Sequence, residues 1–285
     1  MPSIDVNGVS LYYERSGSGE PVVFCHGIPT DYRAWSAQVP VFAKKHTTIT
    51  YSRRYAAPNK RDGDVSDSTV AANAADLKGL IEQLDIAPAH IVGHSYGGFI
   101  AAYLAAEHPD LIRRLVLVEP AISTLLVEDA NSAGQRFSLF LGKPGVALSA
   151  QRFKSGSLGP SLKALDAGQL EKAVQLNVDG IEDKSGAFAA MPEAARKMML
   201  DNARTIAELR TTFPPFKSSI GKISARTLVV NGDESPLWLR RVGQLVKDGI
   251  PKSEAITITG ARHFPHIENA AEFNTYVPGF LIKQV

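Results

Sequence analysis

AHIVGHSYGGFIAAYLAAEHP, residues 89–109, passes without a linker from an apolar, strand-like run into a helical pattern. At the junction, residues 93–97 read GHSYG, which fits the pattern G-x-S-x-G. A serine in this pattern occupies a sharp strand-to-helix turn, and the flanking glycines leave room for the backbone as the turn tightens. The sequence therefore predicts that Ser95 presents its hydroxyl group at the carboxyl end of a sheet.

Short β-rich runs alternate with helical patterns on both sides of this junction. The alternation predicts right-handed crossovers and a mostly parallel sheet with helices on both faces, which is an α/β fold. The predicted strands are 10–16, 21–27, 47–52, 89–95, 113–120, 225–233 and 254–260, and the predicted helices are 68–84, 96–108, 237–248 and 268–283.

The alternation stops between residues 123 and 218, where no convincing strand pattern occurs. This segment shows only helical patterns, at 128–141, 160–179 and 192–210, separated by Gly, Pro and Ser. We therefore predict one α/β core, formed by residues 1–122 and 219–285, that is interrupted by a helical insertion at 123–218.

The composition favours a small-molecule partner. Lys and Arg total 31 and Asp and Glu total 29, so the near-neutral balance gives no indication of nucleic-acid binding. No apolar run is long enough to insert into a membrane, and the N-terminus lacks a secretory pattern, which together favour a cytoplasmic protein. The single cysteine, Cys25, is consistent with a reducing compartment. Nothing in the sequence predicts the oligomeric state.

Three motifs carry a resemblance to a known family. HGIPTDYRAW (26–35), GHSYGG (93–98) and GARHFPHIENAAEF (260–273) resemble, in the same order, motifs of the α/β-hydrolase fold superfamily. The resemblance covers the core, about two thirds of the chain. It implies the α/β-hydrolase fold, a mostly parallel central sheet flanked by helices, and it implies that the insertion is a helical cap domain above the active site.

The resemblance also implies roles for individual residues. Ser95 is the expected nucleophile, and the backbone N–H groups of Ile28 and Tyr96 are the expected donors of an oxyanion hole. A serine hydroxyl needs a base that titrates near neutral pH, and histidine is the natural choice. His263 lies where the family places this base, with His266 as the alternative.

The acid that should orient this base is missing from its usual place. In most members an Asp lies three residues after the glycine that ends the strand corresponding to TLVVNG, but counting from Gly232 leads to Ser235. The haloalkane-dehalogenase-like and zearalenone-lactonase-like branches use an acid after the sixth core strand instead. Glu119 holds that position in RRLVLVEP and is the expected acid; Asp233 or Glu234 is the alternative.

Substrate contacts are predicted only in outline. Large apolar side chains that are candidates for lining a substrate cavity, each with packing as the alternative, are Trp35, Phe137, Phe140, Phe153, Phe188, Met191, Met198 and Trp238. Arg53 and Arg54 either bind a substrate carboxylate or fix their own loop through salt bridges.

Together these predictions indicate a serine hydrolase that cleaves a carboxylic ester or lactone through an acyl-enzyme, with no cofactor and no metal. A perhydrolase or a C–C bond hydrolase needs the same triad and stays open. A ligand sensor with little turnover is the alternative from another class. A serine at the elbow argues against haloalkane dehalogenase or epoxide hydrolase chemistry, for which this fold uses an aspartate.

Overall fold

The computed structural model describes residues 2–59, 65–129, 131–211 and 213–282. These residues form a sheet of eight strands in the order β1-β2-β4-β3-β5-β6-β7-β8. The strands are β1 (Ser3–Val6), β2 (Val9–Ser16), β3 (Glu20–Cys25), β4 (His46–Tyr51), β5 (Ala89–His94), β6 (Ile112–Val118), β7 (Arg226–Gly232) and β8 (Ser253–Ile258). The predicted strands are all present, and the α/β class is confirmed.

β1 pairs with β2, and β2 with β4, in antiparallel orientation. The remaining pairings, along the order β4-β3-β5-β6-β7-β8, are all parallel. The central strands are apolar because both faces of a parallel sheet are covered by helices; β5, for example, is buried along its whole length. β1 was missed by the sequence analysis. Its signal is Asn7-Gly8, where both residues have positive φ, +48° and +76°, as a tight hairpin between β1 and β2 requires.

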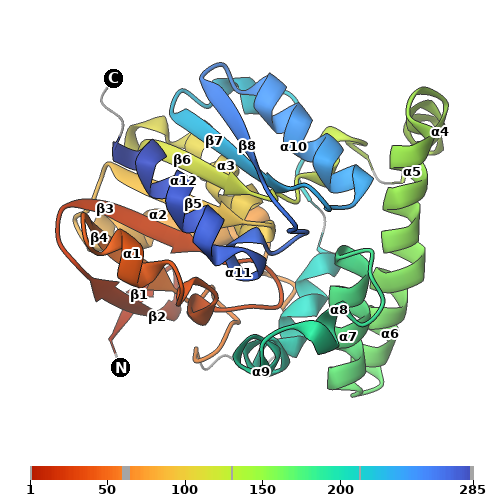
Figure 1. The fold of residues 1–285 in the computed structure, drawn as a ribbon, viewed down its shortest axis with the longest axis horizontal. Helices are drawn as coiled ribbons and strands as arrows, with labels where there is room; N and C mark the ends of the chain where they lie inside the picture. Colours follow the sequence, from red (N-terminus) through yellow and green to blue (C-terminus); the bar gives the residue numbers. More distant parts are fainter. Residues whose placement is uncertain (1, 60–64, 130, 212, 283–285) are drawn as a thin grey trace.

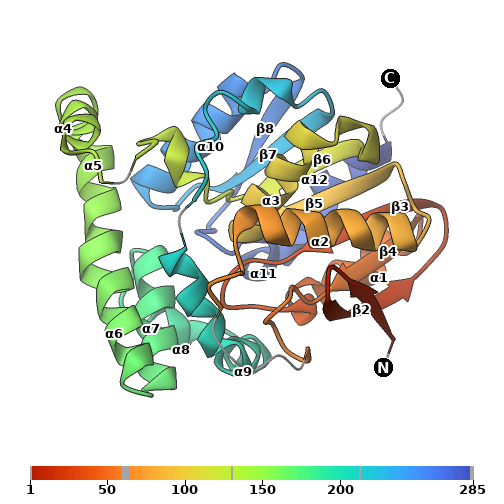
Figure 2. The ribbon, with the colours of Figure 1, turned by 180° about the vertical axis from the view of Figure 1, so that it is seen from behind.

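Helices cover both faces of the sheet. Figure 1 shows α1 and α12 in front of one face, and Figure 2 shows α2 in front of the other. Helix α3 packs on α2, β5 and β6, so the helix that follows Ser95 is fixed from several sides. The core helices are η1 (Tyr32–Trp35), α1 (Val39–Phe42), α2 (Val70–Gln83), α3 (Tyr96–Glu107), η2 (Pro109–Leu111), η6 (Ile220–Lys222), α10 (Leu237–Gly249), α11 (Pro265–Glu268) and α12 (Ala270–Ile282).

The predicted closing helix, 268–283, is two helices in the structure, α11 and α12, and the first begins three residues earlier than predicted. Residue 283 lies outside the described residues. The predicted helix at 68–84 begins at Val70, because the Thr69 hydroxyl accepts a hydrogen bond from the Ala72 N–H and caps the first turn.

The chain between β6 and β7 is helical wherever it is described. It lies to one side of the sheet, at the right in Figure 1 and at the left in Figure 2. Its elements are η3 (Ser123–Leu125), α4 (Ala133–Gly142), α5 (Pro144–Gln151), the π-helix η4 (Arg152–Leu158), α6 (Gly159–Asp166), α7 (Leu170–Ile181), α8 (Ala187–Ala190), α9 (Glu193–Asp201) and the 3-10 helix η5 (Ala203–Arg210).

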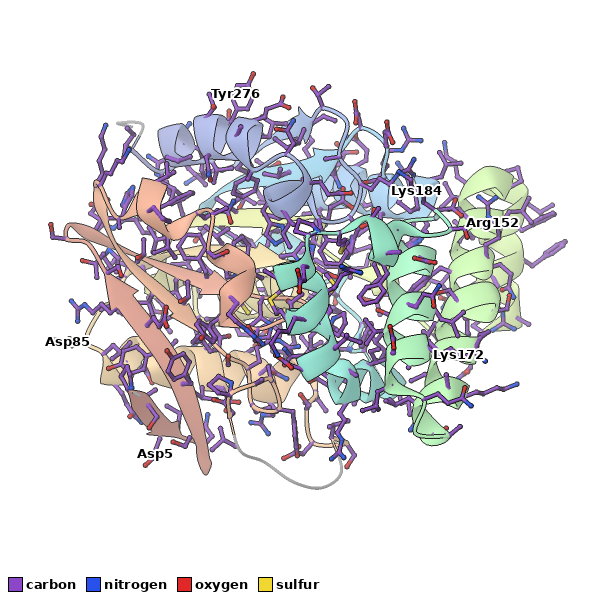
Figure 3. The ribbon with its side chains drawn as sticks, turned by 60° about the horizontal axis from the view of Figure 1, so that its bottom comes forward. Asp5, Asp85, Arg152, Lys172, Lys184 and Tyr276 are labelled. Atoms are coloured by element: carbon purple, nitrogen blue, oxygen red, sulfur yellow. The ribbon has the colours of Figure 1, made fainter. Side chains whose placement is uncertain are left out.

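Three helix predictions in this segment need correction. The helix predicted at 160–179 breaks at Gly168, whose φ of +71° is incompatible with a continuous helix. The helix predicted at 192–210 changes from α9 to 3-10 geometry after Asp201, and the one predicted at 128–141 begins only at Ala133, with residue 130 outside the described part. The outer surface carries exposed basic side chains such as Arg152, Lys172 and Lys184, which point away from the core (Figure 3).

Within the described ranges, no helix has the length and apolar character needed to span a bilayer.

Candidate active site

Ser95 stands at the turn between β5 and α3, as predicted. Its φ of +54° lies in the left-handed region, which is strained for a serine. The turn closes tightly on its neighbours: a Cβ atom on Gly97 would overlap the carbonyl oxygens of Cys25 and His26, and one on Gly93 would overlap the backbone of Gly97. Only glycine fits at either position: Gly97 is required by the close approach of α3 to the end of β3, and Gly93 by the close approach of β5 to the first turn of α3.

His263 lies on the loop after β8 and reaches the serine. Its Nε2 is 2.9 Å from the Ser95 Oγ. The backbone of the loop is fixed by His94, whose Nε2–H donates to the His263 carbonyl oxygen at 2.7 Å. His266, the alternative base, is fully buried and packs against Trp35, with 4.5 Å between ring centroids and the ring planes tilted by 31°. Burial lowers the pKa of His266 to about 3.

Glu119 supplies the carboxylate beside His263. It follows β6, has a φ of +45° and is completely buried. Its Oε2 lies 3.5 Å from His263 Nδ1, which is ion-pair distance, and neither atom has a hydrogen-bond partner among the described residues. Ser95, His263 and Glu119, which follow β5, β8 and β6, thus form a continuous chain of polar contacts.

The other carboxylate oxygen of Glu119 is held by the end of β7. Its Oε1 accepts from Asn231 Nδ2 at 2.9 Å, from the Gly232 N–H at 2.8 Å and from the Ser235 hydroxyl at 2.7 Å. Ser235 Oγ also lies 2.8 Å from the Arg262 carbonyl oxygen, so its single proton serves one of two acceptors at a time. Ser235, which occupies the usual position of the acid, therefore contacts the carboxylate of Glu119, which follows a different strand.

The alternative acids have no ion pair with His263 among the described residues. Asp233 and Glu234 are both exposed, and Glu234 Oε2 forms a 2.8 Å ion pair with Arg262 Nη2. Ser235 and Asn231 were not assigned a function from the sequence. The spacing of the family's acid from Gly232 was the available signal for Ser235, since it placed this residue at the end of the strand next to β6.

A second buried carboxyl group, from the insertion, approaches the same loop. Glu182 directly follows α7, and its Oε2 accepts from the His263 N–H at 3.4 Å. Burial, together with the neighbouring carboxyl of Glu268, raises the pKa of Glu182 well above its usual range. Nothing in the sequence analysis indicated this residue. Within the described ranges, no three His, Cys, Asp or Glu side chains are grouped so that they could bind a metal ion.

A cavity of about 1150 Å³ opens above the serine. Its lining includes Ser95, His263, Ile28 and Tyr96 from the core, and most of its other lining residues come from the segment 121–218. Among the predicted substrate-contacting residues, Phe140, Phe153 and Trp238 line it, and Phe153 stacks on Trp238 at 5.5 Å. The structure thus brings one end of an apolar cavity to the Ser95 hydroxyl.

The other predicted contacts are not part of this lining. Trp35 is fully buried against Phe24 and His266 in the core. Phe137 points outward from α4 with 62% of its surface exposed. Phe188, Met191 and Met198 are buried in the packing of the insertion, because helical spacing places apolar side chains between packed helices as readily as in a cavity.

Arg53 and Arg54 form the salt bridges that one alternative required. Arg53 Nη1 lies 2.6 Å from Glu208 Oε2, and both side chains are fully buried. Arg54 Nε lies 2.8 Å from Asp76 Oδ2 on α2. Neither arginine belongs to the cavity lining.

The strand order, the serine at the tight turn and the histidine on the last loop define an α/β hydrolase. Residues 20–270 match the α/β hydrolase fold family, and the chain belongs to it. Over 276 residues the chain is 29% identical to the putative non-heme bromoperoxidase BpoC from Mycobacterium tuberculosis strain H37Rv. The alignment covers 94% of this chain and 95% of BpoC.

Two further comparisons differ in extent. The chain is 29% identical over 114 residues to the soluble epoxide hydrolase from Corynebacterium sp. strain C12, and this match covers 40% of the chain and 39% of that protein. Among solved structures, the thermophilic esterase from Thermogutta terrifontis superposes with a TM-score of 0.71 at 20% identity, covering 99% of this chain and 98% of the esterase. The likeness to the esterase is one of fold.

Proposed function

We propose that this protein is a serine hydrolase that cleaves a carboxylic ester or lactone through an acyl-enzyme. The observation that carries the proposal is the 2.9 Å contact between Ser95 Oγ and His263 Nε2 at the end of an apolar cavity. The structural likeness to an esterase is consistent with it. A lactone is a cyclic ester, so the same chemistry applies to both substrates.

Acylation begins when Ser95 Oγ forms a bond to the carbonyl carbon of the substrate and passes its proton to His263 Nε2. The electron pair of the C=O bond moves to the oxygen. In this proposal the backbone N–H groups of Ile28 and Tyr96 donate hydrogen bonds to that oxygen. One such donor contributes about 3 kcal/mol to lowering the barrier. The tetrahedral adduct then collapses, and the leaving alkoxide takes the proton from His263.

Glu119 acts through His263. Its carboxylate faces Nδ1 at 3.5 Å, which favours the tautomer with a proton on Nδ1 and a free electron pair on Nε2. It also stabilises the imidazolium that forms in each half-reaction. Water then attacks the acyl carbon, with His263 as the base, and releases the carboxylic acid and the free serine.

The helical insertion at 123–218 is, in this proposal, the lid of the site. It contributes Phe140 and Phe153 to the lining of the cavity that also contains Ser95. These apolar walls suit the acyl portion of an ester better than a charged substrate.

Replacement of Ser95 by alanine tests the proposal. The Ser95→Ala variant should lose turnover of p-nitrophenyl acetate and of a simple lactone by a factor on the order of 10⁶, because no nucleophile remains. Retention of most of the activity by this variant would falsify the proposal.

A fluorophosphonate probe separates the enzyme from the ligand sensor. Rapid labelling of Ser95 together with many turnovers of ester supports the hydrolase. Labelling without multiple turnover would favour the sensor, because the serine would be reactive but the catalytic cycle would not close.

A further inference from the structure

We propose that Arg53, held by Glu208 of the helical insertion, is a positioning residue that orients the Gly27–Ile28 peptide group, whose N–H is one of the two oxyanion donors. This inference rests on the proposed function. It makes the oxyanion hole depend on contact between the insertion and the core.

The carbonyl oxygen of Gly27 is surrounded by hydrogen-bond donors. It accepts from His26 Nδ1 at 2.8 Å, from the Thr30 hydroxyl at 3.1 Å, from the Thr30 N–H at 3.4 Å and from Arg53 Nη2 at 3.4 Å. The C=O and N–H of a trans peptide point in opposite directions. Donors that hold the Gly27 oxygen therefore direct the Ile28 N–H the other way, and Ile28 lines the cavity together with Ser95.

Arg53 also fixes the histidine that takes part in this arrangement. The backbone N–H of Arg53 donates to His26 Nε2 at 2.9 Å, so Nε2 must be the unprotonated ring nitrogen. His26 Nδ1 must then carry the proton that it donates to the Gly27 carbonyl oxygen. Burial, with a further contribution from Arg53, lowers the pKa of His26 well below its usual range and keeps the ring neutral. Arg53 Nε donates in addition to the His26 carbonyl oxygen at 3.2 Å.

The same guanidinium group reaches the other donor residue. Its Cζ lies 4.9 Å from the centre of the Tyr96 ring, and the Tyr96 N–H is the second proposed oxyanion donor. One buried cation thus contacts both sides of the oxyanion hole, through the Gly27 carbonyl and through the Tyr96 ring.

Glu208 holds this cation in place. Glu208 lies in η5, 155 residues after Arg53 in the chain, and its Oε2 accepts a hydrogen bond from Arg53 Nη1 at 2.6 Å. Burial on its own would lower the pKa of Arg53, but the Glu208 carboxylate outweighs it and raises the pKa above the ordinary value. Without Glu208 the guanidinium would be a buried, unpaired charge, which is strongly unfavourable, so it would move toward water and away from the Gly27 carbonyl.

Arg54 provides a matched control in the next position. It forms a comparable buried pair with Asp76, through Nε at 2.8 Å and Nη2 at 2.9 Å. This pair joins the loop after β4 to α2, and among the described residues none of the hydrogen bonds or ion pairs of Arg54 involves Gly27 or Tyr96. A general effect of losing a buried arginine should therefore appear equally in Arg53 and Arg54 variants, whereas an effect on the oxyanion donors should appear only for Arg53.

The test compares Arg53→Lys and Glu208→Gln with Arg54→Lys in the full-length chain. For Arg53→Lys and Glu208→Gln we expect kcat for p-nitrophenyl acetate, and the rate constant of fluorophosphonate labelling, to fall by about 10- to 100-fold, somewhat less than the loss of a whole donor. KM should change little, because the ground-state carbonyl depends less on these donors. Arg54→Lys should keep kcat within about threefold of the unmodified protein, even if its melting temperature falls by as much as that of Arg53→Lys.

Thr30 gives a second test that leaves the buried ion pairs intact. Thr30→Val removes one donor to the Gly27 oxygen without changing the side-chain volume much and should lower kcat by up to about tenfold, whereas Thr30→Ser should restore it. Equal kcat in the Arg53→Lys and Arg54→Lys variants, or an unaltered kcat in Thr30→Val, would overturn the inference. Those outcomes differ from failure of the proposed function, which is signalled by an active Ser95→Ala variant.

Discussion

The carboxylate next to His263 comes from Glu119 at the end of β6, while the end of β7 contributes a serine and an amide that contact it. The two strands are neighbours in the sheet, so a carboxylate at the end of either can reach the same histidine. Moving the acid between strands keeps the position of the charge and changes only the backbone that carries it.

A pair of amide substitutions tests the identity of the acid. Glu119→Gln should lower kcat by about 10⁴-fold, because the amide no longer stabilises the imidazolium and can favour the wrong tautomer. Asp233→Asn, at an exposed position, should leave kcat within about twofold. The measurement is steady-state hydrolysis of p-nitrophenyl acetate, and the reverse ranking of the two variants would assign the acid to the end of β7.

At the scale of secondary-structure elements, the elbow depends on how closely α3 approaches β3 and β5. Helix α3 begins directly after Ser95 and packs on β5, β6 and α2. Its first residues contact the backbone of the loop after β3, where any side chain at Gly97 would overlap the carbonyl oxygens of Cys25 and His26. The position of the nucleophile is therefore determined by backbone packing between elements.

Alanine at Gly97 should consequently damage both folding and activity. Because the backbone must shift, we expect a loss of about 1–3 kcal/mol in the free energy of unfolding, measured by urea titration, and a large fall in kcat. Gly134→Ala on α4 is the control, since an added Cβ there meets no atom within 4 Å. It should alter the free energy of unfolding by less than about 1 kcal/mol, in the stabilising direction. A fully active and stable Gly97→Ala protein would contradict this account of the elbow.

At the scale of the whole molecule, buried histidines affect the pH dependence of stability. Five of the seven histidines have a lowered pKa, with burial as the main cause in each: His26, His46, His90, His94 and His266. The pKa of His90 falls to about 4 and that of His266 to about 3. Between these values and about 6.5, the unfolded chain binds protons that the native protein does not bind.

Acidification should therefore destabilise the native state through these histidines, by up to about 1.4 kcal/mol per pH unit for each one that stays neutral, a slope that is reached well below pH 6.5. The raised pKa values of Glu182 and Glu268 act in the opposite direction, so the clearest measurement is a difference between two proteins. His266→Phe keeps an aromatic ring against Trp35 and removes one titrating group. Its free energy of unfolding should fall by about 1 kcal/mol less than that of the unmodified protein when the pH drops from 6.5 to 5.5, because the unfolded histidine is only half protonated at pH 6.5. Parallel pH profiles would rule out this role for His266.

Much of the core could be predicted from the sequence because its signals are local. The periodicity of apolar residues identified each central strand, and the glycines around Ser95 identified the strained turn, since each depends on residues close in the chain. The hairpin of β1 and β2 was missed although Asn7-Gly8 carries its signal. The helices of the insertion were predicted less well: the break at Gly168, where the backbone takes a φ of +71°, and the change to 3-10 geometry after Asp201 both fall inside stretches whose apolar spacing reads as one continuous helix.

The sequence by itself thus determined the α/β class, the turn at Ser95 and the candidates for base and acid. Only the tertiary structure decided which candidates meet: Glu119 rather than Asp233 faces His263, Trp238 rather than Trp35 lines the cavity, and Arg53 joins Glu208 beside the Gly27 carbonyl. The physical reason is the same in each case. These contacts join residues far apart in the chain, and their distances follow from strand order and helix packing, which no local pattern of residues encodes.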